Sequence, residues 1–208
     1  MKVLILQPKL EKQIKQLEGE ITENPDIDAV IFPEGYLNEN IKKACEVARR
    51  FNTVLIGGYR RLQEKPKDRA LIINRSGEII LDRVKYSTTA FVEVEDMKIG
   101  HILCDELIVQ RIKGTDYQGV DLIVHPIGVG MFSEEQFAEW IAEATKIAID
   151  YKTMIIGTSH ADGSFRDSDI SIPIAYCIVK DGTAVFISKN DVRTRIVDVQ
   201  TNEVLIYK

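Results

Sequence analysis

The chain has 208 residues, of which 45% are hydrophobic and 28% charged, a composition that excludes disorder and predicts one globular domain over residues 1–208. Its formal charge of −5, with lysines and arginines scattered among acidic residues, argues against a nucleic-acid surface and favours a small-molecule partner. No apolar run is long enough to span a membrane, and the N-terminal run is too short for a signal peptide.

The first third of the chain alternates between expected strands and helices. Short apolar runs that end at proline, glycine or polar residues indicate buried strands over residues 2–7, 29–32 and 53–56. Apolar residues spaced three and four apart indicate helices with one buried face over residues 10–22 and 39–51. This alternation is typical of an α/β layer with parallel strands.

The rest of the chain is dominated by expected hairpins. The paired runs are residues 69–74 with 78–84 and residues 91–94 with 98–104. A long helix is expected from Ser133 to Tyr151, with Ser133 as its cap and Glu135 or Gln136 in box position. The remaining expected strands cover residues 121–124, 153–159, 170–179, 183–188 and 191–199. Together these elements predict two sheets with helices on their outer faces.

The three cysteines, Cys45, Cys104 and Cys177, are widely spaced and odd in number. This pattern favours free thiols over a disulfide framework, so we expect a reducing compartment, the cytoplasm. No CxxC pair or cluster of histidine and cysteine supports a metal site. Cys45 lies within an expected helix, where packing is its expected role.

The stretch IGHILCDEL, residues 99–107, ends an apolar run on Cys104 and continues with Asp105 and Glu106. The two carboxylates favour the start of a helical turn, which places Cys104 on a strand-to-helix elbow. Unpaired backbone N–H groups at such an elbow can stabilise a thiolate or an oxyanion. A buried, unreactive cysteine is the other interpretation of the same pattern.

Glu34 and Lys85 also lie at or just after the ends of expected strands. In α/β sheets such strand ends meet at one edge, where ligands bind, so a site shared with Cys104 is plausible. A cysteine nucleophile needs a base for its proton, and an acyl-transfer intermediate needs positive charge or N–H donors near its oxygen. Glu34 fits the base and Lys85 fits the oxyanion partner, although each could instead be a solvated loop or edge charge.

These three residues resemble the nitrilase, or carbon–nitrogen hydrolase, superfamily. The family has, in this order, a glutamate in a Phe-Pro-Glu context, a lysine after a strand and a cysteine in a Gly-x-x-Ile-Cys-x-Asp-like context. The matching segments are Phe32-Pro33-Glu34, Val84-Lys85-Tyr86 and Gly100-His101-Ile102-Leu103-Cys104-Asp105. The resemblance extends through His125-Pro126 and the helix 133–151 to Gly157, and so covers nearly the whole chain.

The resemblance implies a four-layer α-β-β-α sandwich and hydrolysis of an amide, carbamoyl or nitrile bond. Cys104 would form a thioester with the substrate, and Glu34 would act as general base. Lys85 and the backbone N–H of Asp105 would hold the oxyanion. The resemblance implies no metal or organic cofactor, a small amide-like substrate and a homodimer or larger homo-oligomer.

The sequence departs from the family pattern at several points. The segment between Lys85 and Cys104 is shorter than in typical members, which carry a further glutamate there; Glu93 or Glu95 is the candidate to substitute for it. Cys-Asp-Glu replaces the usual Cys-Tyr-Asp type of triplet, and a histidine replaces the usual asparagine before proline. The residues expected at the rim of the site are Glu106, His125 and Tyr36.

Two other histidines and several aromatic residues complete the expectations. His101 alternates with Cys104 along the strand and should face the other way, whereas His160 lies in a turn and should be exposed. The aromatic residues expected to line the pocket, or alternatively to pack in the core, are Tyr36, Tyr86, Phe91, Phe132 and Trp140.

Three functions are consistent with this sequence. A cysteine-dependent hydrolase of carbon–nitrogen bonds is the leading hypothesis. A nitrilase-like binding or regulatory protein without turnover is the alternative, and a carboxylate from residues 86–98 that reaches Cys104 would distinguish the two. A redox sensor ranks last, because no second cysteine is close in sequence to Cys104.

Overall fold

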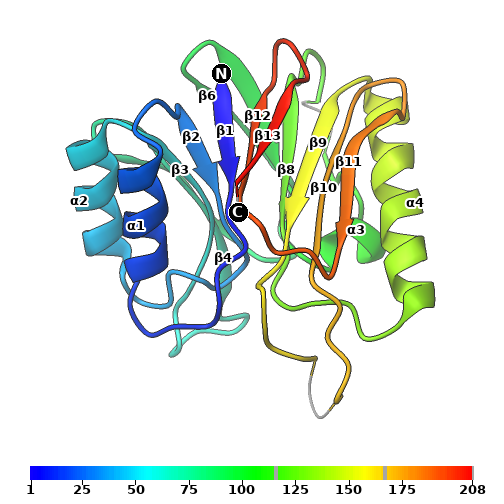
Figure 1. The fold of residues 1–208 in the computed structure, drawn as a ribbon, viewed down its shortest axis with the longest axis horizontal. Helices are drawn as coiled ribbons and strands as arrows, with labels where there is room; N and C mark the ends of the chain where they lie inside the picture. Colours follow the sequence, from blue (N-terminus) through cyan, green and yellow to red (C-terminus); the bar gives the residue numbers. More distant parts are fainter. Residues whose placement is uncertain (115–116, 166–167, 208) are drawn as a thin grey trace.

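The computed structural model describes residues 1–114, 117–165 and 168–207. Within these residues, one sheet has seven strands in the order β13-β12-β1-β2-β3-β4-β5, and the other has six in the order β11-β10-β9-β8-β7-β6 (Figure 1). The strands of the first sheet are β13 (Val204–Ile206), β12 (Arg195–Asp198), β1 (Lys2–Ile5), β2 (Ala29–Ile31), β3 (Val54–Arg60), β4 (Asp68–Ile73) and β5 (Ile79–Val84). Those of the second are β11 (Ala184–Lys189), β10 (Ile174–Ile178), β9 (Met154–Thr158), β8 (Leu122–Pro126), β7 (Met97–His101) and β6 (Ala90–Val94).

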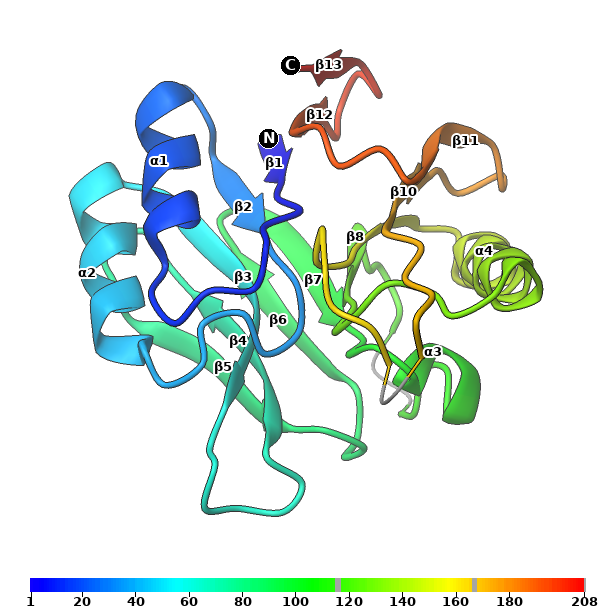
Figure 2. The same ribbon diagram turned by 60° about the horizontal axis from the view of Figure 1, so that its bottom comes forward.

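Each sheet has three parallel strands at its centre and antiparallel strands outside them. The parallel strands are β1, β2 and β3 in one sheet and β7, β8 and β9 in the other. The hairpins β4–β5 and β6–β7 confirm the two hairpins that the sequence indicates. The carboxyl ends of the parallel strands therefore meet at one edge of the molecule, which is turned forward in Figure 2.

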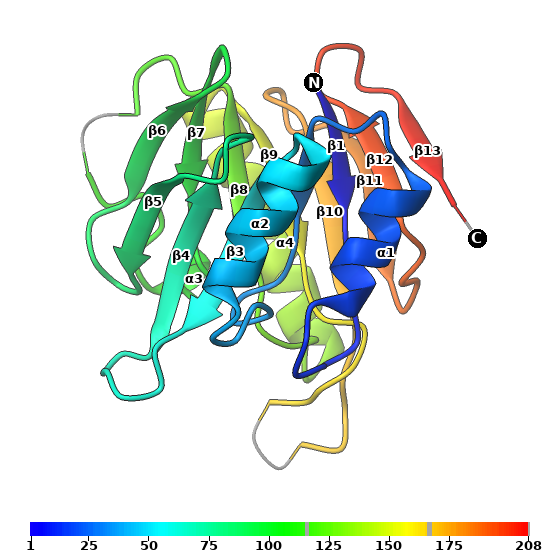
Figure 3. The ribbon, with the colours of Figure 1, turned by 90° about the vertical axis from the view of Figure 1, so that its left-hand side faces the viewer.

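Helices cover the outer face of each sheet and complete a four-layer α-β-β-α sandwich. Figure 3 shows α1 (Lys15–Glu23) and α2 (Ile41–Phe51) in front of the first sheet, while α3 (Glu106–Val109) and α4 (Glu134–Tyr151) lie on the other. The strand residues alternate accordingly: Val3 packs between the sheets, and Leu4 packs under α1 and α2. The fold class expected from the sequence is confirmed.

The start of one helix differs from the expected one because side chains compete with regular structure. Helix α1 begins at Lys15, because the preceding loop satisfies its backbone with side chains: Gln16 Oε1 accepts from the N–H of Lys9, and Glu11 Oε1 accepts from that of Gln16. Helix α4 begins as expected, with the Ser133 hydroxyl accepting from the Gln136 N–H. The three-residue strand β13 is too short for its sequence to indicate it.

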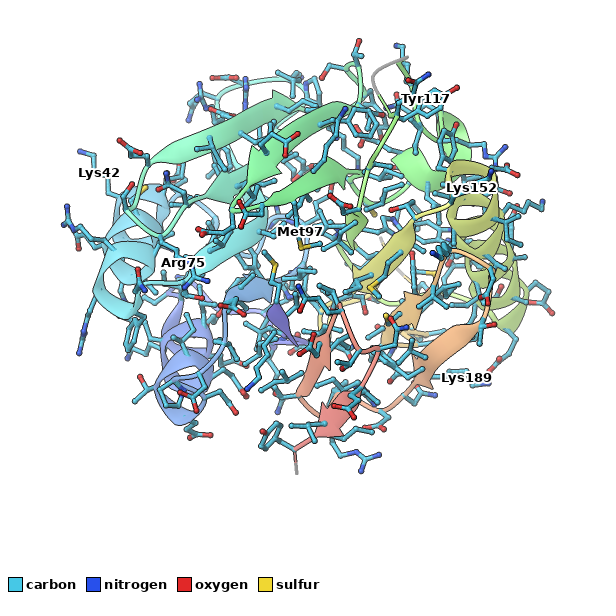
Figure 4. All side chains as sticks on the ribbon, turned by 90° about the horizontal axis from the view of Figure 1, so that it is seen from above. Lys42, Arg75, Met97, Tyr117, Lys152 and Lys189 are labelled. Atoms are coloured by element: carbon cyan, nitrogen blue, oxygen red, sulfur yellow. The ribbon has the colours of Figure 1, made fainter. Side chains whose placement is uncertain are left out.

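Arg75 joins the two sheets at the end opposite the strand carboxyl ends, as the view from above shows (Figure 4). It donates to Asp28 Oδ1 at 2.6 Å and to the Asn52 carbonyl at 2.8 Å in the first sheet's loops. It also donates to Glu95 Oε1 at 3.1 Å in the turn between β6 and β7. Met97 lies near the centre of this end (Figure 4). Glu95 is therefore far from the edge that carries Cys104.

Candidate active site

Cys104 lies on a sharp turn between β7 and α3, as the sequence pattern predicts. Its φ angle of +49° is left-handed, a conformation that costs a residue with a side chain about 1–2 kcal/mol. The Cys104 N–H donates to the Pro126 carbonyl at 2.8 Å and holds this turn against β8. Asp105 follows directly and leads into α3. The elbow places Cys104 at the wall of a cleft of about 530 Å³.

Glu34, Lys85 and Cys104 all line this cleft, although they follow three different strands. The Lys85 ammonium lies 2.8 Å from Glu34 Oε1, and the same carboxylate lies close enough to the Cys104 thiol for its charge to raise the pKa of that thiol. Glu34 and Lys85 are nearly buried, with 5% and 9% of their surface exposed. The structure thus brings together the three residues that the sequence separates by long intervals.

The charges of these groups set their protonation states. Burial raises the pKa of the Glu34 carboxyl, although the Lys85 charge opposes the shift. Burial also raises the pKa of the Cys104 thiol well above its usual range, and the Glu34 charge adds to this effect. Burial alone would lower the pKa of Lys85, but attraction to the Cys104 sulfur and the Glu34 carboxylate raises it. At neutral pH the thiol is protonated, so attack requires a base.

Glu106 lies behind the site and fixes Lys85 relative to Cys104. Only 1% of its surface is exposed. Its carboxylate accepts four hydrogen bonds, from Arg83 Nη1 (2.8 Å), Arg83 Nη2 (2.6 Å), Leu103 N (2.7 Å) and Tyr86 N (2.5 Å). Arg83 and Tyr86 lie on either side of Lys85 in the sequence, and Leu103 directly precedes Cys104. Glu106 therefore braces the two segments that carry these residues, from beneath the cleft rather than at its rim.

We expect Arg83→Met to destabilise the protein by about 3–5 kcal/mol, because it leaves Glu106 buried with only two of its donors. Urea unfolding measures this change. The matched control is Lys189→Met, which removes a surface pair with Glu134 whose side chains are 43% and 62% exposed, and should change little. A loss below about 1 kcal/mol for Arg83→Met would show that the bracing is not needed.

His125 is fully buried and supports the elbow from behind. Its Nε2–H donates to the Cys104 carbonyl at 2.7 Å, while Nδ1 accepts from the Tyr176 hydroxyl. The ring of Trp140 lies 5.5 Å away between centroids. Burial lowers the pKa of His125 to about 4, so the ring is neutral near pH 7. His125 is thus a hydrogen-bonded support rather than a group at the rim.

Tyr36 lies outside the catalytic cleft. Its side chain is 1% exposed, and its hydroxyl donates to Glu11 Oε1 at 2.5 Å and accepts from the Leu17 N–H at 3.1 Å. It lines a neighbouring pocket of about 820 Å³. Gly35, with φ of +72°, reverses the chain between Glu34 and Tyr36 and sends their side chains to different sides.

The other two histidines are buried as well. His101 faces the space between the sheets, where its Nε2–H donates to the Gly57 carbonyl at 2.9 Å, so its expected direction is confirmed. The expectation that His160 is exposed is wrong, because only 1% of its surface is accessible. The loop after β9 folds back onto the loop after β1, and the Ala161 N–H donates to the Pro8 carbonyl at 2.9 Å.

Gly128 is a site residue that the sequence reasoning missed. Its N–H donates to the Cys104 sulfur at 3.5 Å. A Cβ at this position would lie 2.6 Å from Glu34 Oε2, so a side chain here would displace the Glu34 carboxylate. The sequence signal was a glycine shortly after the strand that ends at His125-Pro126.

Aromatic as well as charged side chains line the cleft. The aromatic residues lining it include Tyr86, Phe132, Trp140 and Phe165. Phe91 does not line it and instead packs against the cluster under α4. Phe132 and Phe165 lie 5.9 Å apart between ring centroids.

The segment between Lys85 and Cys104 contributes no carboxylate to the cleft. Neither Glu93 nor Glu95 lines it, and Glu95 pairs with Arg75 at the opposite end. The second carboxylate at Lys85 comes from Asp105, whose Oδ1 lies 2.8 Å from the ammonium. The side chain of Asp105 was not expected in this position from the sequence.

Among residues 1–114, 117–165 and 168–207, no group of three or more histidine, cysteine or acidic side chains could hold a metal ion. No helix in the described part of the chain is both long and apolar enough to cross a membrane.

The fold is that of the nitrilase-superfamily amidases and carbon–nitrogen hydrolases. No protein-family model matches the chain, and no curated protein matches its sequence. A variant of the amidase from Nesterenkonia sp. AN1, in complex with butyramide, superposes with a TM-score of 0.78 at 10% identity, over 97% of this chain and 93% of that one.

Two further solved structures show the same likeness. A carbon–nitrogen hydrolase from Helicobacter pylori G27 has a TM-score of 0.77 at 12% identity, covering 97% of this chain and 90% of its own. A glutamate-to-glutamine variant of the Nesterenkonia amidase shows covalent addition of the acetamide moiety of fluoroacetamide at the active-site cysteine. Its TM-score is 0.75 at 9% identity, over 95% of this chain and 89% of that one. At these identities the likeness establishes the fold.

Proposed function

We propose that the protein is a thiol-dependent hydrolase of non-peptide carbon–nitrogen bonds, in amides, carbamoyl compounds or nitriles. The observation that carries the proposal is that one buried carboxylate, Glu34, lies close to both the Cys104 thiol and the Lys85 ammonium. Amidases of the same fold, with an active-site cysteine, support this assignment. The free thiols support the cytoplasm as the compartment, and the homodimer expected from the family resemblance stays a prediction.

For an amide, the first half of the reaction forms a thioester. Glu34 takes the proton of the Cys104 thiol as the sulfur bonds to the carbonyl carbon. The carbonyl oxygen becomes an oxyanion, which Lys85 and the backbone N–H of Asp105 stabilise. The protonated Glu34 then gives its proton to the nitrogen, the carbon–nitrogen bond breaks and the amine or ammonia leaves.

The second half consumes one water. Glu34 takes a proton from the water as its oxygen attacks the thioester carbon, and the same donors hold the new oxyanion. The carbon–sulfur bond then breaks, the acid leaves and the proton returns from Glu34 to the Cys104 sulfur. The raised pKa of Glu34 suits this exchange, because a buried carboxylate accepts and releases protons closer to neutral pH.

A substrate panel tests the proposal. Purified protein is incubated with small aliphatic amides, N-carbamoyl compounds and aliphatic nitriles, and ammonia release is measured alongside the intact mass of the protein. We expect ammonia from at least one class, with an acyl adduct on Cys104 at short times. Amides with an apolar acyl group should be turned over best, because Trp140 and Phe132 line the cleft. Without turnover or an adduct, the binding-protein alternative gains support.

We expect Glu34→Gln to lower kcat by roughly 10²–10⁴-fold, the usual contribution of a general base. In the unchanged protein, kcat/KM should rise with pH as Glu34 loses its proton, and the midpoint should lie above the ordinary value of 4.5 because burial raises this pKa. Steady-state kinetics from about pH 4 to about pH 9 measure both effects. An acid limb with the same midpoint in the Glu34→Gln protein would assign the base to another residue.

A further inference from the structure

We propose that the Asp105 carboxylate, held by the Tyr86 hydroxyl, is a positioning residue that fixes the Lys85 ammonium for the reaction at Cys104. This inference rests on the proposed function and deepens it. In the mechanism above only the backbone N–H of Asp105 takes part, and this inference gives its side chain a role as well. It also supplies the second carboxylate that the short segment between Lys85 and Cys104 does not provide.

The geometry places the ammonium between two carboxylates. Lys85 Nζ lies 2.8 Å from Glu34 Oε1 and 2.8 Å from Asp105 Oδ1. An ammonium has three N–H donors, so two such contacts leave one donor for a substrate oxygen. With Asp105 absent, a flexible lysine side chain paired only to Glu34 could rotate about that single contact. Two anchors therefore set the direction of the third donor.

Tyr86 holds Asp105 in place. Its hydroxyl donates to Asp105 Oδ2 at 2.8 Å, so both carboxylate oxygens are engaged. Its ring centroid lies 5.2 Å from Lys85 Nζ and covers the ammonium on one side. The backbone of Tyr86 is itself fixed, with φ of +67° and its N–H donating to Glu106.

Two consecutive residues on one segment thus contact two consecutive residues on the other. Lys85 pairs with Asp105, and the backbone of Tyr86 bonds Glu106. Asp105 also follows the nucleophile directly, so its anchor moves with the Cys104 elbow. The arrangement keeps the ammonium in register with the sulfur, which is what an oxyanion donor requires.

The negative charge of Asp105 should affect thiol deprotonation and turnover in opposite directions. A carboxylate beside Cys104 opposes formation of the thiolate and contributes to the raised pKa of the thiol. Removing it should therefore make the thiol easier to deprotonate, while turnover falls because Lys85 is less well directed. The side chain of Asp105 is 41% exposed, so solvent screening keeps both effects moderate.

The experiment compares Asp105→Asn with the unchanged protein in two assays. We expect kcat for the best amide to fall about 10- to 100-fold with KM within about threefold, since the interaction acts in the transition state. We expect the pH midpoint for alkylation of Cys104 by iodoacetamide to move down by about half a unit or more. Asp105→Glu should recover part of kcat, and the exposed carboxylate variant Glu93→Gln should match the unchanged protein in both assays.

Tyr86→Phe is the milder variant and should lower kcat by less than Asp105→Asn, with little change in the alkylation midpoint. The inference would be overturned if Asp105→Asn changed neither kcat nor the pH midpoint of alkylation. It would also be overturned if kcat fell and Cys104 became harder to alkylate, because losses in both assays mark general disruption of the site. If the unchanged protein hydrolyses no substrate, the proposed function fails. The alkylation midpoint then decides the inference by itself, because an unshifted midpoint in Asp105→Asn would show that the Asp105 carboxylate does not act on the site.

Discussion

Replacing Cys104 by alanine is expected to lower kcat/KM for the best amide by roughly 10⁴-fold or more, to the background rate. The reason is that the thioester cannot form without the sulfur, and Glu34 and Lys85 then have no nucleophile to act on. The fold should persist, because Cys104 lies on a turn that its backbone bond to Pro126 holds in either variant. Ammonia release and circular dichroism measure the two outcomes.

Cys45→Ala is the matched control for this variant. Cys45 is a partly buried residue of α2, on the outer face of the first sheet and away from the cleft. Its replacement should leave turnover unchanged. Substantial turnover by the Cys104→Ala protein would refute the covalent mechanism.

The second large expected effect is a loss of stability in mild acid. All three histidines of the chain are buried. Burial lowers the pKa of His101 to about 3 and that of His125 and His160 to about 4, against an ordinary value of 6.5. The unfolded chain takes up these protons at higher pH than the folded protein does. Stability is therefore fully present above about pH 6.5 and falls as pH drops toward 4.

Each histidine contributes about 1.4 kcal/mol per pH unit within this window. Urea unfolding at a series of pH values from about 7.5 to about 4.5 gives the slope, and hence the protons taken up on unfolding, which should approach three. Glu34 and Glu20 oppose the trend, because their raised pKa values favour the folded state as pH falls, but they are two carboxyl groups against three histidines. His160→Gln should reduce the slope by one proton. A stability that does not change between pH 6.5 and 5 would contradict buried neutral histidines.

The sequence predicts the site better where the information is local. Glu34 and Cys104 follow the parallel strands β2 and β7, and Lys85 follows β5, which runs in the same direction as β3 because two antiparallel pairings separate them. The ends of all three strands therefore meet at one cleft. The elbow at Cys104 is predictable for the same reason, since the carboxylates that begin the next turn are adjacent in the chain.

Other placements depend on contacts between distant segments and could not be predicted. His160 is buried by the loop after β1, which lies about 150 positions earlier in the sequence, where its Nδ1 contacts Pro8. Glu106 looked like a rim residue, because nothing near it in sequence indicates that Arg83 neutralises it. The role of the Asp105 side chain depends on the position of the Lys85 ammonium. The pattern of apolar residues in the sequence does not predict that position.

The left-handed backbone at position 104 favours glycine for stability, whereas the proposed activity requires cysteine there. Glycine adopts φ of +49° without the strain that a Cβ introduces, so a glycine at position 104 would make the fold more stable by about 1 kcal/mol than an alanine there. A library of variants selected only for resistance to heat or protease would favour glycine at this position. Stabilisation of this protein by selection therefore needs an activity screen in every round, because a glycine at position 104 removes the proposed nucleophile.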